Sequence, residues 1–252
     1  MKIDRRKNYY LIFDTETAGE EENGDLVKHI YDIGYTIATK NEIVKKRNFL
    51  VQEIFTDIDE MKKAYYYSKM PIYLQMLNDG KISIVPFAKI VKQLQEDIKT
   101  YNVKFACAYN VGFDLSAFME TTELIYPNKF KMLFAQTKSG KWRPDKEQFF
   151  NKYIAKANLE ILDIWTMACQ TLCSQKTFQA YYLEETPRGN IKSNAEIVYN
   201  YITDQDGLFE EDHTALSDSI IETEILQRIL RNNKKLKTKY AYMPFRLIER
   251  VV

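Results

Sequence analysis

The chain has 252 residues, of which 45% are hydrophobic and 28% charged, a balance that excludes a disordered or fibrous protein. Its net charge of +1 excludes a globally basic surface, so a nucleic-acid partner would have to bind a local patch. Cys107, Cys169 and Cys173 contain no Cys-x-x-Cys pair, which argues against a disulfide framework or a structural zinc site. The basic segment 1–7 leads into a short apolar run, too short for a signal sequence or a membrane span. We therefore expect a cytoplasmic protein with no membrane partner.

The first predicted strand ends in two carboxylates, within the sequence YLIFDTET (10–17). Asp14 and Glu16 are two residues apart, so in a strand they project from the same face. Like charges held this close resist joint ionisation unless a cation lies between them, and hard oxygen ligands suit magnesium or manganese. Taken alone, such a pair is more often two ordinary surface acids at the end of a strand.

The next elements predict an α/β protein. Residues 29–39 and 43–51 are β-rich and separated by three polar residues, which predicts a hairpin. A helix is predicted from Ser83 as the N-cap, with Pro86 in its first turn and apolar residues at helical spacing up to Ile98.

Strands and helices then alternate. Residues 103–109 (VKFACAY) read as a buried central strand, and a helix follows over 113–124. A strand over 159–164 leads into a helix over 165–173, and a long amphipathic helix begins near Asp212. This order predicts a mixed β-sheet flanked by helices on both faces.

We expect a single domain over 1–252. Two segments read as insertions, one over 53–80 and one over 127–156, the second with a hairpin turn at Ser139-Gly140. Residues 232–252 form a C-terminal extension.

Three further residues can complete a metal site with Asp14 and Glu16. Asp114 follows the buried strand, where open α/β folds place their ligands, although it could also be an acid favoured by a helix N-terminus. Asp218 lies on the last helix among apolar neighbours, and a buried aspartate needs a partner. His213, five residues earlier, titrates near neutral pH and is therefore suited to act as a general base.

These residues lie in three segments, FDTET (13–17), YNVGFD (109–114) and HTALSD (213–218), that resemble the exonuclease motifs of the DEDDh 3′-to-5′ exonuclease family, in that family's order. Segments 29–34 (HIYDIG) and 162–168 (LDIWTMA) add weaker similarity. The variant with a catalytic tyrosine places it four residues before the last aspartate, where this chain has Thr214. Tyr109 departs from the family by replacing a histidine.

The resemblance implies an RNase H-like fold in which four carboxylates hold two divalent ions, Mg²⁺ or Mn²⁺. Asp14 would bridge the ions, Glu16 and Asp218 would complete the site for the attacking water, and Asp114 would serve the other ion. His213 would deprotonate the water, and hydrolysis would release nucleoside 5′-monophosphates.

Substrate contacts are a further expectation. The resemblance places the terminal nucleotide near the first two motifs, and the residues expected to contact it are Thr15, Thr17, Ala18, Asn110 and Phe113. Core packing is the alternative for Phe113. A basic and aromatic hairpin could bind phosphates and unstacked bases, or be an ordinary solvated hairpin; its residues are Lys138, Lys141, Trp142 and Arg143.

Two more sets of side chains carry expectations. Consecutive Tyr65, Tyr66 and Tyr67 could stack on substrate, but such a run faces different ways, so part of it is expected in the core. We interpret His29 as structural and Asp163 as the cap of the following helix.

The function that we expect is metal-dependent hydrolysis of 3′ ends of single-stranded nucleic acid, DNA in preference to RNA. The enzyme would be either free-standing or a proofreading partner of a DNA polymerase in DNA replication. The alternatives are a catalytically silent nucleic-acid-binding protein and a polymerase-associated scaffold. The basic run 231–237 and the apolar end 240–252 are the features that suggest an interaction subunit.

Overall fold

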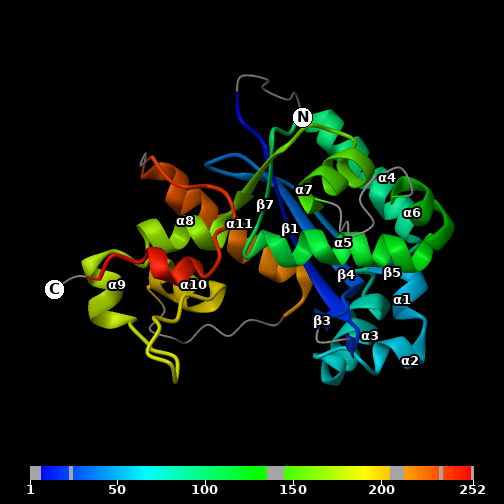
Figure 1. Ribbon diagram of the computed structural model, residues 1–252, viewed down its shortest axis with the longest axis horizontal. Coiled ribbons are helices and arrows are strands. Elements are labelled where there is room, and N and C mark those ends of the chain that lie inside the picture. The colour runs from blue at the N-terminus through cyan, green and yellow to red at the C-terminus, as the bar shows by residue number, and fades with distance from the viewer. Residues whose placement is uncertain (1–6, 23–24, 135–144, 205–212, 233–234, 251–252) are drawn as a thin grey trace.

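The computed structural model describes residues 7–22, 25–134, 145–204, 213–232 and 235–250 (Figure 1). Its centre is a six-stranded sheet in the order β6-β5-β4-β1-β7-β8. The strands are β1 (Tyr10–Ala18), β4 (His29–Ala38), β5 (Ile43–Val51), β6 (Ser83–Val85), β7 (Phe105–Ala108) and β8 (Glu160–Asp163). The strands β2 (Glu21–Glu22) and β3 (Asp25–Leu26) form a separate two-stranded ribbon.

The sheet is mixed, as the sequence predicted. β4 is antiparallel to both β1 and β5. β7 is parallel to β1 and to β8, and β6 is parallel to β5. The hairpin comes first and the parallel strands follow, in the order expected from the chain.

Helices cover both faces of the sheet (Figure 1). The first apolar core lies under α1 (Gln52–Phe55), α4 (Phe87–Tyr101) and α5 (Val111–Ile125), and it receives Leu11 and Phe13 from β1. The second core lies under α8 (Ile164–Thr171), α10 (Ala195–Thr203) and α11 (Ala215–Arg231), and it receives Tyr10 and Ile12. As far as Glu16, the period of two along β1 therefore assigns even positions to the α11 face and odd positions to the α5 face; an irregularity between Glu16 and Thr17 then shifts the pattern, and Ala18 lies in the first core.

The predicted insertions and connections are mainly helical. The remaining elements are α2 (Ile58–Met61), η1 (Tyr67–Lys69), α3 (Met70–Asn78), α6 (Pro127–Phe134), α7 (Lys146–Phe149), the π-helical η2 (Phe150–Ala155), α9 (Lys176–Tyr181) and η3 (Pro244–Leu247). The hairpin expected at Ser139-Gly140 lies outside the described residues.

One predicted boundary is wrong. Ser83 does not cap a helix, because Ser83–Val85 pairs as the parallel edge strand β6 with Phe49–Val51. The helix α4 begins after Pro86, which is its N-cap. β-branched Ile84 and Val85 favour a strand before the proline, so the helical spacing applies only from Phe87 onward.

A glycine and an aspartate fix the N-terminus of α11 on the sheet. A Cβ built on Gly34 of β4 would lie 2.0 Å from the backbone nitrogen of Leu216, so only glycine permits this approach. Two residues before it, the fully buried Asp32 accepts a 3.0 Å hydrogen bond from the Ala215 backbone N–H and another from the Tyr73 hydroxyl. The start of α11 is thus held against the centre of β4.

The C-terminal extension packs back onto the end of β8. The Asp163 backbone N–H donates to the Thr238 carbonyl at 2.7 Å, and the Ala241 N–H donates to the Thr166 hydroxyl at 3.2 Å. The side chain of Gln170 makes hydrogen bonds to both backbone groups of Lys237. This segment is part of the domain rather than a detached tail. Within the described ranges, no helix has both the length and the apolar character needed to cross a membrane.

Replacing Gly34 with alanine tests this packing. The added methyl would overlap backbone that cannot move independently of α11, so we expect Gly34→Ala to lower the free energy of unfolding by at least about 3 kcal/mol or to prevent folding. Gly80→Ala is the control, because no described atom lies within 4 Å of a Cβ there and only its positive φ opposes alanine, at a cost of about 1 kcal/mol. Equal urea-denaturation midpoints for the two variants would contradict the packing described.

Candidate active site

The alternation of side chains along β1 places the first two acids. Asp14 and Glu16 occupy even positions and so face α11, and their antiparallel partners on β4 are Gly34 and Asp32. These partners are the residues that hold the start of α11. The same two cross-strand pairs therefore place the acids and bring the last helix over them.

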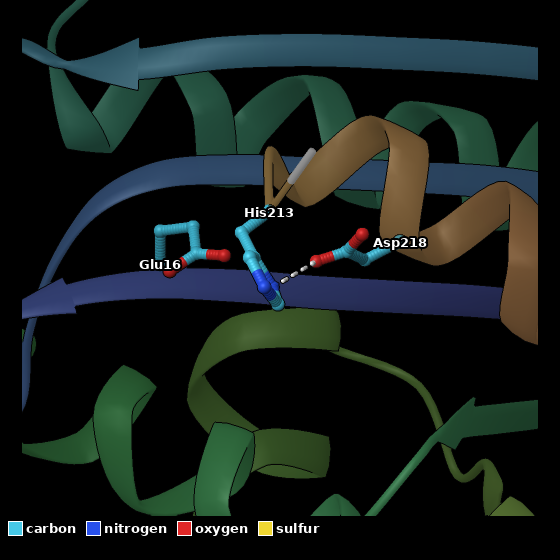
Figure 2. A group of neighbouring side chains, drawn as sticks. All are labelled: Glu16, His213 and Asp218. Atoms are coloured by element: carbon cyan, nitrogen blue, oxygen red, sulfur yellow. Dashed lines mark ion pairs between the residues drawn. The ribbon is translucent and has the colours of Figure 1, made fainter. Parts of the chain in front are cut away.

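The start of α11 adds His213 and Asp218 to the acids of β1. One ligand atom from each of Glu16, His213 and Asp218 lies within 4.8 Å of the others. The His213 Nδ1 lies 3.9 Å from the Asp218 Oδ2, and the imidazole lies between the two carboxylates (Figure 2). His213 has a left-handed backbone with φ of 50°, which is strained for a residue with a side chain and is typical of functional positions.

Asp114 reaches the site from the opposite face of the sheet. Asn110, with φ of 67°, is the N-cap of α5, and Asp114 lies in the first turn of that helix. The hydroxyl of Thr15, an odd position of β1, donates a 2.8 Å hydrogen bond to the Asp114 Oδ1. The α5 face thus supplies one carboxylate and the hydroxyl that orients it.

The buried Asp163 connects the two helices that follow β7 and β8. Its carboxylate accepts hydrogen bonds from the Thr166 backbone N–H at 2.9 Å and the Val111 N–H at 3.0 Å. The predicted cap of α8 is therefore confirmed. The same side chain also fixes the first turn of α5, and with it the position of Asp114.

Crowding raises the pKa values of the carboxyl groups. Burial raises the pKa of Asp14 well above its usual range, and Glu222, Asp114, Asp218 and Glu16 raise it further. Burial and then Asp218 and Asp32 raise the pKa of Glu16 to about 9, against an opposing effect of the Lys69 ammonium. Burial raises the pKa of Asp114 to about 7, although the Thr15 hydrogen bond opposes this shift. A bound cation would lower these pKa values, because its positive charge stabilises the ionised carboxylates.

This donor set fits hard divalent cations. Four carboxylates with one imidazole beside them offer mainly oxygen ligands, the chemistry that Mg²⁺ and Mn²⁺ prefer. The site is built from rigid elements on both faces of the sheet. Glu16, His213 and Asp218 therefore converge on one point, and Asp14 and Asp114 lie near enough for the charge of Asp114 to raise the pKa of Asp14.

The insertion over 53–80 contributes two residues that the sequence did not single out for the site. The Tyr66 ring stacks on the His213 imidazole, with centroids 4.4 Å apart and an interplanar angle of 13°. Lys69 lies over the Tyr66 ring, with its Nζ 5.0 Å from the ring centroid. The tyrosine run suggested stacking on substrate, and in the structure Tyr66 stacks on the histidine instead.

A fifth carboxylate was also missed. Glu222 lies four residues after Asp218 on α11, is 3% exposed and, after burial, contributes most to raising the pKa of Asp14. Its spacing of one helical turn from Asp218 was the available signal. It passed unnoticed because the surrounding pattern of α11 reads as an apolar core face.

The expected substrate contacts lie in different surroundings. Thr15 is buried and directs its hydroxyl to Asp114, and Ala18 is 1% exposed within the first core. Thr17 and Asn110 are partly exposed, and Phe113 is partly exposed with Lys28 Nζ 5.6 Å from its ring centroid. Contacts from these residues to a nucleotide stay a prediction. The basic hairpin over 138–143 lies outside the described residues. His29 pairs with Glu60 at 2.6 Å, in keeping with a structural role.

Comparison with known proteins identifies the fold. Neither the known protein families nor the curated proteins give a match to the sequence. The chain is similar to a solved structure of a 3′-exonuclease, described as 3′-end-specific recognition of a histone mRNA stem-loop. The TM-score between the two is 0.51 at 14% sequence identity, and the match covers 92% of this chain and 85% of that one. The similarity shows that the two chains share a fold.

Two other solved structures have TM-scores below 0.5. One is the nuclease domain of 3′hExo, a DEDDh family member, bound to rAMP, with 0.48 at 16% identity, covering 95% of this chain and all of that one. The other is a full-length 3′-exonuclease, with 0.49 at 13% identity, covering 94% and 88%. The comparison of folds therefore rests on the first structure, and the mixed α/β sheet with helices on both faces that the sequence predicted is the fold that the two chains share.

The stack of Tyr66 on His213 can be tested by NMR. The chain has two histidines, so selective histidine labelling gives signals from His213 and His29 only. We expect Tyr66→Leu to shift the ring protons of His213 downfield, because the ring current of the tyrosine is lost, while Tyr66→Phe keeps them near their wild-type positions. His29 serves as the internal reference, and a His213 spectrum unchanged in Tyr66→Leu would show that the stack does not form.

The raised carboxyl pKa values predict how stability depends on pH. The folded, metal-free chain keeps protons on Asp114 and Glu16 that the unfolded chain has already released, so the stability from these groups is present at low pH and lost as pH rises through about 7 and about 9. In chelator, we expect the Tm of wild type to fall between about pH 5 and pH 9 relative to Asp114→Asn.

Two comparisons complete this test. The exposed substitution Asp59→Asn should retain the wild-type dependence, and adding Mn²⁺ near pH 8 should restore the lost Tm of wild type. A difference between wild type and Asp114→Asn that does not change with pH would contradict the shifts.

Proposed function

We propose that this protein is a metal-dependent 3′-to-5′ exonuclease that hydrolyses the terminal phosphodiester bond of a nucleic acid. The observation that carries the proposal is the convergence of Glu16, His213 and Asp218 within 4.8 Å, beside the electrostatically coupled Asp14 and Asp114. The fold shared with a 3′-exonuclease supports it. A scaffold without catalysis would gain nothing from this buried acid cluster, which is unfavourable without cations.

The chain's own residues would divide the chemistry among them. Asp14, Glu16, Asp114 and Asp218 would hold two divalent ions, which supply charge stabilisation for the attacking and leaving oxygens of the phosphoryl displacement. His213 would accept the proton of the attacking water, because its imidazole lies beside Glu16 and Asp218. The Thr15 hydroxyl would keep Asp114 in position.

The proposed reaction forms one bond and breaks one. The water oxygen attacks the terminal phosphorus, and the P–O bond to the 3′ oxygen of the preceding nucleotide breaks. The products are a nucleoside 5′-monophosphate and a strand that is one nucleotide shorter. Tyr66 would keep the His213 ring within the site during this step, since the two rings are stacked.

The substrate that we propose is a single-stranded 3′ end, of DNA in preference to RNA. The structural neighbour acts at the 3′ end of an RNA stem-loop, so both polymers belong in the test. Three further parts of the proposal are supported by the sequence alone. They are a single exonuclease domain over 1–252, a DNA polymerase as partner and a cytoplasmic location.

The experiment follows the shortening of labelled single-stranded DNA and RNA. We expect stepwise loss from the 3′ end in Mg²⁺ or Mn²⁺ and none in chelator. Asp14→Ala should lower kcat by at least about 1,000-fold, and His213→Ala by about 100- to 10,000-fold, as expected for loss of a general base.

Matched variants of the same residue types serve as controls. Asp59→Ala removes an aspartate whose side chain is 91% exposed, and His29→Ala removes the other histidine of the chain. Both should retain activity within a few fold. Intact substrate with both metals would refute the enzyme, and cleavage that survives Asp14→Ala would refute the site.

A further inference from the structure

A large cavity lies beside the loop that carries Asn110. Its volume is about 920 Å³, within the range of small-molecule sites. It is lined by the end of α9, the segment 182–194 and α10, together with Tyr109, Asn110 and Trp165. We call it the aromatic groove. The sequence did not predict this groove, and Asn110 is the lining residue that it predicted to contact a nucleotide.

The groove and the candidate active site share the connection between β7 and α5. Asn110 lines the groove and is the N-cap of α5, whose first turn carries Asp114. The buried Asp163 joins the two regions, because it binds the Val111 N–H at the start of α5 and caps α8, which carries Trp165. Asn110, at the edge of the groove, therefore lies about one helical turn from Asp114.

Two fixed aromatic rings form one wall of the groove. The rings of Tyr109 and Trp165 are stacked, with centroids 6.4 Å apart and an interplanar angle of 20°. The Tyr109 hydroxyl donates to the Ser193 carbonyl at 2.5 Å, and the Trp165 Nε1–H donates to the Ser193 hydroxyl at 2.8 Å. Both rings are thus held in place, and the 82% exposed Tyr181 lies at the rim. Unstacked bases bind to aromatic surfaces of this kind.

The polar groups of the groove suit a base rather than a phosphate. Asn190 and Asn194 offer amides, which can both donate to and accept from the edge of a base. Lys192 is paired with Glu184 at 2.7 Å, and Glu196 also lines the groove, so the lining has no excess of positive charge. The sugar-phosphate backbone would not be attracted there.

We propose that the aromatic groove binds an unstacked base of the substrate strand that lies at least two positions 5′ to the nucleotide that is removed. The inference rests on the proposed function and narrows its substrate class. A base that is paired and stacked in a duplex cannot present its face to Tyr109 and Trp165. The groove thus selects single-stranded 3′ ends that are longer than a dinucleotide.

Trp165 itself provides the measurement. The chain has two tryptophans, so Trp142→Phe leaves Trp165 as the only one, and Asp14→Ala prevents cleavage. We expect a single-stranded DNA octamer to quench the emission of Trp165 in this double variant. A dinucleotide, and a blunt hairpin of the same length of strand, should quench it weakly or not at all.

Substitutions at the rim test the same contacts without Trp165. Tyr181→Ala and Asn194→Leu, each in the Asp14→Ala background, should weaken binding of a labelled octamer by about 5- to 100-fold, the effect of losing contacts to one base. Binding of the dinucleotide should weaken less. The control is Tyr242→Ala, which removes a 78% exposed tyrosine outside the described lining of the groove and should leave octamer affinity unchanged.

The outcomes separate this inference from the proposed function. In one outcome, wild type shortens DNA, but the octamer does not quench Trp165 and binds the rim variants as tightly as the parent. The groove would then serve another ligand, such as a peptide, and the inference would be wrong while the exonuclease proposal is supported. If the octamer quenches Trp165 but wild type cleaves nothing, the groove stands and the exonuclease proposal is wrong.

Discussion

The repulsion between carboxylates gathered in one buried place is the constraint on which the rest of the site depends. Burial raises the pKa values of Asp14, Glu16 and Asp114, and neighbouring carboxylates, Glu222 and Asp218 among them, raise the pKa of Asp14 further. A folded chain keeps such a cluster only if packing elsewhere offsets its cost, and the cost falls when a cation binds. The packing that offsets this cost is in two apolar cores, one on each face of the mixed sheet.

The central strands β1 and β4 determine where the carboxylates lie. Alternation along β1 sends Asp14 and Glu16 to one face and Thr15 to the other, so the site receives α11 on one side and Asp114 on the other. Opposite them on β4, Gly34 admits the backbone of α11 and Asp32 binds its first N–H group. A single pair of strands thus defines the positions of the acids, of His213 and of the helix that carries Asp218.

The sequence predicted what depends on local pattern and missed what depends on packing. The motifs and the period of two identified the acids, His213, the mixed sheet and the cap at Asp163. The helical spacing after Phe87 led to a wrong N-cap at Ser83, because pairing of β6 with β5 is a long-range contact. Tyr66 was expected to stack on substrate and stacks on His213, because this contact joins residues distant in sequence. Lys69 and Glu222 were not predicted, since Lys69 acts on a distant Glu16 and Glu222 lies on a face of α11 that resembles ordinary core.

The central claim is that the cluster holds divalent cations, and direct binding of Mn²⁺ tests it without any substrate. Electron paramagnetic resonance of free Mn²⁺, titrated into wild type and Asp14→Ala near pH 8, gives the number of ions bound. The account predicts saturable binding of two ions to wild type, with loss of at least one in Asp14→Ala and no change in the exposed control Asp59→Ala. Equal binding to wild type and Asp14→Ala, or none to either, would contradict it.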